Sequence, residues 1–213
     1  MRNLRLLLSL LALLFIGGKS FAQESEQKLK LGLKISPVFS FNRLDDNSSN
    51  FDISPGGTST KLAFGLVADK PFGDNYYFST GIIYLPKGAK IEARPEDGGG
   101  KFKETYKTHY LQVPLTVKLL TNPITDELRA YAQLGGTVDF LINQETGGNQ
   151  IIDKFFFMDV ALVLGGGITY DLSFGNTIGL GLVYQRGLIN AASKGEDIRL
   201  KKDLLMIDLA FYF

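Results

Sequence analysis

The amino-acid sequence predicts an all-β protein, folded as an eight-stranded antiparallel up-and-down β-barrel that crosses a membrane. Eight segments alternate apolar and polar residues with a period of two, which indicates strands with two different faces. The connections between these segments are alternately long and short. The N-terminal segment has the composition of an export signal. Together these three observations favour an exported barrel.

Composition narrows the class of protein further. The chain has 213 residues, of which 22 are acidic, 23 are basic, one is His and none is Cys. This length fits one domain and a targeting segment. The charge is balanced, so no basic excess is available to bind nucleic acid. The lack of Cys excludes disulfides and thiolate sites, and a single His leaves no His-rich metal centre. We therefore expect no cofactor and no metal.

Residues 1–22 have the order of parts found in a signal peptide. The basic start Met1–Arg5 is followed by an apolar run over residues 6–16 and by the small-x-small ending Ser20-Phe21-Ala22. The apolar run is shorter than the about 20 residues of a spanning helix. The sequence therefore predicts cleavage after Ala22 and a barrel domain over residues 23–213. The alternative interpretation is an N-terminal membrane anchor.

The eight alternating segments are the predicted strands. They cover residues 29–41, 61–69, 76–85, 105–120, 128–142, 155–170, 177–188 and 199–213. In the fourth segment the apolar face carries Leu111, Val113, Leu115, Val117 and Leu119, and the other face carries Tyr110, Gln112, Thr116 and Lys118. Each segment approaches the length that a tilted strand needs to cross a bilayer. Pro114 removes one ladder donor and predicts a β-bulge.

The connections favour a membrane barrel over a soluble one. The long connections are residues 42–60, 86–104, 143–154 and 189–198, and the short ones are residues 70–75, 121–127 and 171–176. Outer-membrane barrels have short periplasmic turns and long outer loops, so both termini are expected on the periplasmic side. The chain also ends on Phe211-Tyr212-Phe213, and outer-membrane barrels commonly end on an aromatic residue.

Alternation alone does not decide which face points outward, because a soluble lipocalin-like barrel has its apolar face inside. The polar faces mix small residues with charges of both signs, namely Lys34, Asp69, Lys118, Arg129, Asp139, Asp159 and Asp208. Such a face suits a narrow lumen with paired charges, which places the apolar face against lipid. Aromatic side chains predicted to fill the lumen and argue against a porin are Tyr77, Tyr110, Tyr131, Phe155, Phe157 and Tyr212.

No segment carries a strong catalytic or metal-binding pattern. His109 shares the parity of Leu111, which places it at the lipid interface and not in a hydrolase site, because no Ser lies two positions away. The acidic stretch Asp45-Asp46-Asn47 lacks the spacing of a calcium loop. Residues 165–167 and 98–100 are Gly triplets, and the first lies inside a strand, where Gly permits close packing or a bend. We expect no enzyme.

Parts of the chain also resemble a known family. The block Tyr110-Leu111-Gln112-Val113-Pro114-Leu115, the stretch Gly81-Ile82-Ile83-Tyr84 and the aromatic C-terminus resemble the PorT-type outer-membrane β-barrel family of the Bacteroidetes. The resemblance implies an OmpA/OmpX-like architecture and a non-enzymatic structural or accessory role in an outer-membrane process such as protein secretion. It implies as partners the outer-membrane lipids and lipopolysaccharide, the barrel assembly machinery and secretion-system components. Adhesion through the long loops and a soluble ligand-binding barrel remain the alternatives.

Overall fold

The computed structural model describes residues 29–46, 51–55, 58–95, 102–147, 154–172, 175–189, 192–194 and 198–213. Every regular element in these ranges is a β-strand. The eight long strands are β1 (Lys30–Asp46), β3 (Ser59–Pro71), β4 (Tyr76–Pro95), β5 (Phe102–Leu120), β6 (Leu128–Gly147), β8 (Met158–Asp171), β9 (Thr177–Gly187) and β11 (Ile198–Tyr212). The short strands are β2 (Phe51–Pro55), β7 (Lys154–Phe155) and β10 (Ala192–Lys194). No helix in the described ranges has the length and apolar character to span a membrane.

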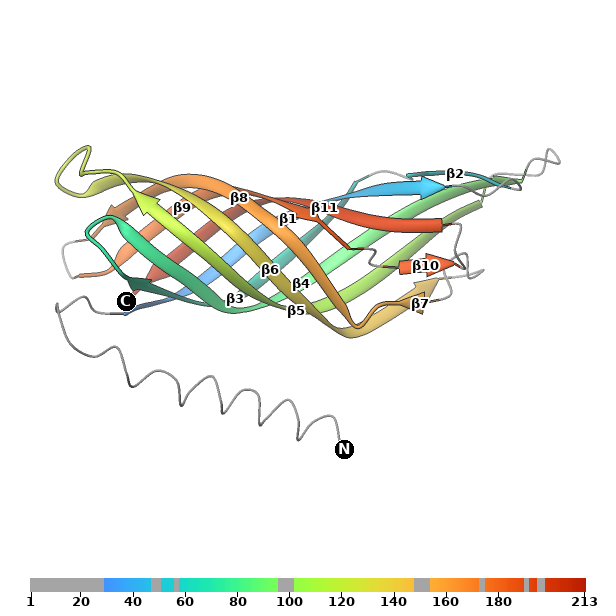
Figure 1. The fold of residues 1–213 in the computed structure, drawn as a ribbon, viewed down its shortest axis with the longest axis horizontal. Helices are drawn as coiled ribbons and strands as arrows, with labels where there is room; N and C mark the ends of the chain where they lie inside the picture. Colours follow the sequence, from blue (N-terminus) through green and yellow to red (C-terminus); the bar gives the residue numbers. More distant parts are fainter. Residues whose placement is uncertain are drawn as a thin grey trace, which may run out of the picture.

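The long strands form a closed antiparallel barrel (Figure 1). Their order around the wall is β1-β3-β4-β5-β6-β8-β9-β11, and β11 pairs back with β1. The closing ladder runs from Gly32 opposite Tyr212 to Asp46 opposite Ile198. Each strand thus lies beside its sequence neighbour, and the first and last strands join. The predicted eight-stranded up-and-down barrel is confirmed.

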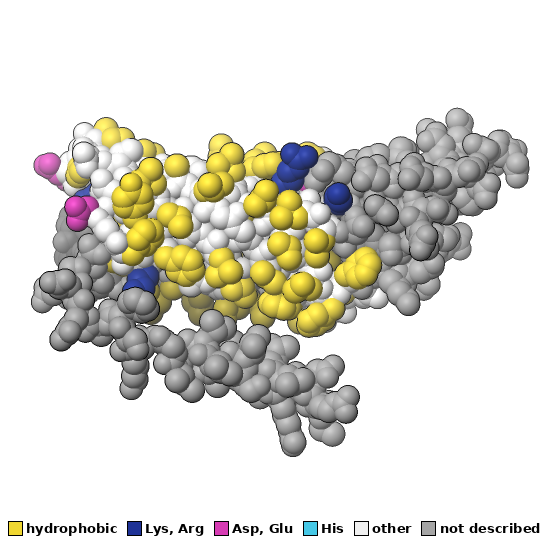
Figure 2. Space-filling model, in the orientation of Figure 1, with side chains coloured by type: hydrophobic (Ala, Val, Ile, Leu, Met, Phe, Trp, Pro, Cys, Tyr) yellow, Lys and Arg dark blue, Asp and Glu magenta, His cyan; other side chains and the backbone are white. Residues whose placement is uncertain are grey.

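The side chains alternate between lipid and lumen. On β9, Leu180 and Leu182 are 47% and 57% exposed, whereas Val183 on the opposite face is 1% exposed. Figure 2 shows hydrophobic side chains spread over the outer wall. We call this band of exposed apolar side chains on the long strands the apolar belt. It agrees with a membrane barrel and contradicts the soluble lipocalin-like alternative, in which the apolar faces would be buried inside.

Several strands run further than the alternation predicted. β4 continues to Pro95 and β5 starts at Phe102, although residues 86–104 were predicted as a loop. β1 and β6 also extend, to Asp46 and Gly147. The sequence of these added stretches does not alternate regularly between apolar and polar residues, although the backbone ladder continues through them.

Pro114 does not form a bulge, so that prediction is wrong. The β4–β5 register is the same on both sides of it, from Thr80 opposite Leu115 to Ile83 opposite Gln112. The ladder between β4 and β5 is interrupted beside the proline, but neither strand gains the extra residue that defines a β-bulge. The register shift in β5 lies between His109 and Tyr110, where it faces β6.

The short connections gather at one end of the barrel. β3 and β4 are joined through residues 72–75, β5 and β6 through residues 121–127, and β8 and β9 through residues 172–176. Gly175 has a φ of 81°, a left-handed conformation that favours glycine in a tight turn. β1 begins and β11 ends at the same end, which Figure 1 places on the left. We call this the short-turn end.

Candidate functional site

The lumen is the part of the molecule where polar and charged side chains gather, and it has two levels. Away from the short-turn end, the lumen is filled by tightly packed side chains. The apolar members of this level include Val38, Ile83, Leu85, Val183 and Leu204, each at most 2% exposed. Towards the short-turn end the lumen opens into a cavity. Among the described residues, the site is therefore a pocket whose inner end meets packed side chains.

A buried ion cluster lies at the packed level. The Lys87 ammonium is 2.6 Å from an Asp139 carboxylate oxygen and 2.8 Å from an Asp159 oxygen. All three side chains are at most 2% exposed. The Gln112 amide donates to Asp139 at 2.9 Å and to the Gln185 carbonyl at 3.1 Å. Because a buried charge is costly without a partner, this network holds its strands in one register.

Tyr110 lies at the same packed level of the lumen. Its ring is fully buried, and the Lys87 and Lys202 ammonium groups lie 4.5 Å and 5.8 Å from its centroid. Such distances allow cation–π attraction. Lys202 also donates to the Thr108 hydroxyl at 3.0 Å. The ring and the two cations are therefore packed together inside the lumen.

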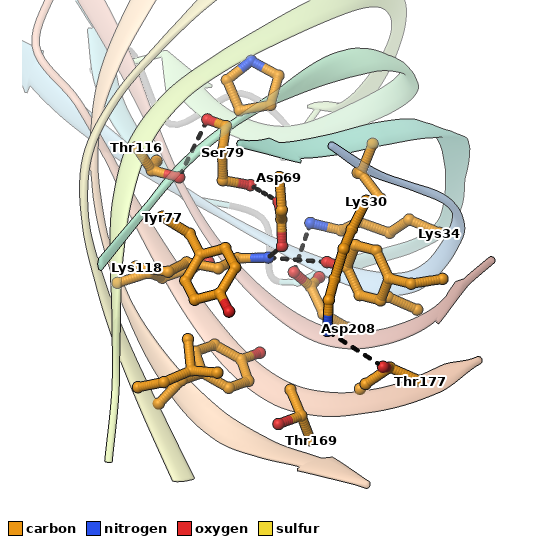
Figure 3. A pocket seen from close by; sticks show the side chains of 18 of the residues that line it. Lys30, Lys34, Asp69, Tyr77, Ser79, Thr116, Lys118, Thr169, Thr177 and Asp208 are labelled. Carbon is orange, nitrogen blue, oxygen red and sulfur yellow. Dashed lines mark hydrogen bonds and ion pairs between the residues drawn. The ribbon is translucent and has the colours of Figure 1, made fainter. Parts of the chain in front are cut away.

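The cavity at the short-turn end has a volume of about 120 Å³ and is lined mainly by polar side chains (Figure 3). Lys118 donates to Asp69 at 2.7 Å and to the Tyr212 hydroxyl at 2.8 Å. Lys34 forms an ion pair with Asp208. The predicted pairing of opposite charges in the lumen is thus present, and it ties β1, β3, β5 and β11 together.

Of the aromatic residues predicted to fill the lumen, four do so. Tyr77, Tyr131 and Tyr212 line the cavity, and Tyr110 lies above it. Phe157 is 61% exposed instead, so its predicted inward position is wrong. It lies between β7 and β8, outside regular strand, so the alternation of β8 does not extend to it. The Phe155 side chain lies outside the described residues.

His109 lies on the outer wall, as its parity predicted. Its Nδ1 atom and the Tyr84 hydroxyl share a hydrogen bond of 2.6 Å, and the two rings stack at 5.8 Å. Which atom donates depends on the tautomer of the imidazole. The pair covers two neighbouring strands at the edge of the apolar belt. This geometry fits a structural interfacial side chain.

The predicted Gly triplets and the acidic stretch lie partly inside and partly outside the residues that the structure describes. Gly165, Gly166 and Gly167 lie inside β8, as expected. Asp45 and Asp46 belong to β1, paired with β11, while their side chains and Asn47 lie outside the described part, as do residues 98–100. Within the described ranges, no group of three or more His, Cys, Asp or Glu side chains is placed to hold a metal ion.

Sequence reasoning missed Lys87, which the structure places at the centre of the buried cluster. Its position falls in the predicted connection of residues 86–104, since the third predicted strand ends at residue 85. A usable signal exists, because Lys87 continues the inward parity of Tyr77, Ser79 and Gly81 along one strand. Extending the alternation by one period would have placed it in the lumen.

A closed eight-stranded antiparallel barrel with an apolar exterior and a charged, polar interior defines the class of integral outer-membrane β-barrel proteins. The family described as "Outer membrane protein beta-barrel domain" matches residues 21–193, and the chain belongs to this family. Its place is accordingly the outer membrane. A search of curated proteins found no match.

Solved structures agree on the fold. The chain is similar to the outer membrane protein OprG from Pseudomonas aeruginosa, with 14% identity and a TM-score of 0.52 over 86% of this chain and 96% of that chain. It is also similar to the outer membrane protein AlkL, solved in lipid bilayers, with 15% identity and a TM-score of 0.50 over 92% of this chain and 96% of that chain. At this identity the similarity shows a shared fold.

Proposed function

We propose that this protein is a non-enzymatic component of an outer-membrane protein assembly, such as the secretion machinery that the PorT-type resemblance implies. Its working surface is the part of the sheet that extends past the apolar belt, which we call the sheet extension. The single observation behind this proposal is that four strands continue as one sheet beyond the belt while the lumen behind them is packed.

The sheet extension is the part formed by β2, β4, β5 and β6, and the β1–β11 pair also continues, to Asp46 opposite Ile198. β4 and β5 stay paired from Pro86 opposite His109 to Ala93 opposite Phe102. β2 adds to the free edge of β4, and β6 follows β5 to Gly147. From Pro86 to Pro95 the β4 strand adds about 30 Å, at about 3.3 Å per residue. An extended sheet whose outermost strand, β2, pairs on one side only among the described residues suits docking of a protein strand or surface.

The packed lumen argues against a transport role along the barrel axis. Leu85 and Tyr110 are fully buried in the middle of the lumen, and Lys87 is 2% exposed. An eight-stranded barrel leaves an interior just wide enough for side chains, and the described side chains fill its middle. The apolar belt and the sheet extension are therefore the surfaces that suit contact with another protein.

Export and membrane insertion precede this role. Residues 1–22 act as a cleaved signal peptide, and residues 23–213 form the barrel domain. The barrel assembly machinery inserts the chain with the short-turn end and both termini in the periplasm. Outer-membrane lipids and lipopolysaccharide then surround the apolar belt. This orientation directs the sheet extension to the cell exterior.

Adhesion is the second candidate function, and it uses the same surface. A sheet extension directed outward would contact another cell or a host surface as readily as a partner in the membrane. The two functions differ in what their loss would do, since one supports release of proteins and the other supports attachment of the cell.

A shortened hairpin separates the two candidates. Deleting residues 90–105 and joining Ala89 to Tyr106 through Asn-Gly removes most of the β4–β5 extension and leaves Lys87 in place. The matched control replaces the exposed residues 122–126 at the opposite end with Gly and Ser. Both variants are first checked for heat-modifiable migration on SDS gels, which reports a closed barrel.

Proteins released into the medium and attachment of the cells to surfaces are then measured. The proposal expects the shortened hairpin to reduce protein release while attachment is unchanged. Reduced attachment with normal release assigns adhesion instead. A folded variant with both properties unchanged contradicts both candidates.

A further inference from the structure

Two cations at the mouth of the cavity have no carboxylate partner among the described residues. They are Lys30 on β1 and Arg129 on β6. In the order of the eight long strands, β1 and β6 lie four places apart, so the two side chains approach the cavity from opposite walls. The Lys30 ammonium has one neutral contact, the Thr177 hydroxyl at 3.4 Å (Figure 3).

The carboxylates of the cavity are already engaged by other groups. Asp69 accepts from Lys118 at 2.7 Å and from the Ser79 hydroxyl at 2.5 Å. Asp208 pairs with Lys34 and accepts from the Ser36 hydroxyl. Asp171 accepts from the Thr177 hydroxyl at 2.6 Å. None of the three contacts Arg129 or Lys30 as an ion-pair partner within the part of the chain that the structure describes.

The charge balance of the cavity is therefore positive. Four cationic side chains line it, namely Lys30, Lys34, Lys118 and Arg129, against the three carboxylates Asp69, Asp171 and Asp208. The Arg129 Nε atom is inaccessible to solvent and has no hydrogen-bond partner. A buried N–H donor without a partner loses hydration without compensation. An anion in the cavity would supply that compensation.

We propose that the cavity at the short-turn end is a binding site for an oxyanion, namely the carboxylate or phosphate group of a small solute, with Arg129 as its anchor. The planar guanidinium presents parallel N–H donors that match the oxygens of such a group. Lys30 adds charge from the opposite wall. The volume of about 120 Å³ holds about four waters at about 30 Å³ each, or one oxyanion with a short substituent. This site does not depend on the role proposed for the sheet extension.

Binding is tested on the whole barrel, purified from outer membranes in detergent micelles, with ¹⁵N-labelled Arg. Sodium acetate and inorganic phosphate are titrated separately, with sodium chloride at equal ionic strength as the reference, and the Nε–H resonances are followed. We expect the Arg129 resonance to move along a saturating curve with at least one oxyanion and not with chloride. Saturation by acetate alone identifies carboxylates as the ligand class, and saturation by phosphate alone identifies phosphates. Saturation by both shows that the site binds oxyanions in general.

Arg186 is the internal control, because it is an exposed Arg on the outer face of β9. A linear shift at Arg129, or an equal shift at Arg186, overturns the proposal because it shows non-specific ion effects.

Variants give an independent readout. An oxyanion that binds the folded barrel raises its unfolding midpoint. Arg129→Gln should weaken the apparent affinity at least about tenfold, and Arg186→Gln should leave it unchanged. Arg129→Lys keeps the positive charge but removes the parallel N–H donors of the guanidinium. It is used if Arg129→Gln does not fold, and it should also bind the oxyanion more weakly than the natural protein. Wild-type affinity in a folded Arg129 variant overturns the proposal.

Discussion

The Tyr131 side chain extends across two strands to Gly181. Tyr131 on β6 lies opposite Gly167 on β8, and Gly167 lies opposite Gly181 on β9. A Cβ atom built on Gly181 would meet the Tyr131 hydroxyl oxygen, and one on Gly167 would lie 2.9 Å from the Tyr131 Cε1 atom. Both glycines therefore leave the space that the aromatic ring occupies against the barrel wall.

We therefore expect Gly181→Ala to destabilise the barrel, because the new methyl group displaces the Tyr131 ring. Overpacking of this kind costs about 1–3 kcal/mol. The free energy of unfolding in denaturant, measured after refolding into micelles, checks the value. Gly179→Ala is the matched control on the same strand and face, since its nearest contact would be 3.7 Å from Ala210 Cβ. Equal stability of the two variants would contradict this explanation of the Gly181 position.

Lys87→Met should be far more damaging. It leaves Asp139 and Asp159 buried with no cation between them, and breaking a buried ion pair from one side costs about 3–5 kcal/mol. Lys107→Met removes an exposed ion pair to Glu145 of 3.6 Å and should cost at most about 1 kcal/mol. Denaturant unfolding compares the two. Adding Asp139→Asn and Asp159→Asn to Lys87→Met should restore part of the lost stability.

The closure of the barrel predicts a specific disulfide. Ile35 on β1 lies directly opposite Leu209 on β11, at a separation suited to a disulfide. Since the natural chain has no Cys, the double variant Ile35→Cys, Leu209→Cys should oxidise to one cross-linked species. On a boiled gel it should migrate differently with and without reductant. Ile35→Cys with Leu134→Cys, on opposite walls, should give no internal cross-link. Cross-linking in this control alone would contradict the strand order.

His109 should matter for packing at the edge of the belt and not for chemistry. His109→Leu removes the hydrogen bond to Tyr84 and should cost about 0.5–1.5 kcal/mol in denaturant unfolding. Mass spectra of lipid A should be the same in cells with the natural protein, with the variant and without the protein. A change in lipid A that requires His109 would revive the hydrolase alternative.

The sequence predicted the barrel well because lipid enforces a strict pattern. Every second residue of a strand inside the belt faces hydrocarbon, as Leu111, Leu115 and Leu119 do, and polar residues there are excluded. The pattern ends where the belt ends. Lys87 and the sheet extension were therefore predicted to be loop, although hydrogen bonding continues through them.

The cavity was beyond sequence reasoning for a different reason. Arg129 was correctly placed on the inner face by parity. That Lys30 approaches it from the opposite wall depends on strand order and register, which link residues far apart in the chain. That the nearby carboxylates are engaged elsewhere depends on individual hydrogen bonds. Parity assigns a face to each residue, but it does not assign neighbours across the lumen.

The pairing of β1 with β11 also has a consequence for the state before the barrel closes. The wall is complete only when β11, which follows every other long strand in the chain, pairs with β1, so a sheet without β11 has two bare edges. Such a sheet is a template for aggregation. The ladder between residues 30–46 and 198–212 therefore removes the two edges along which open copies of the chain could pair.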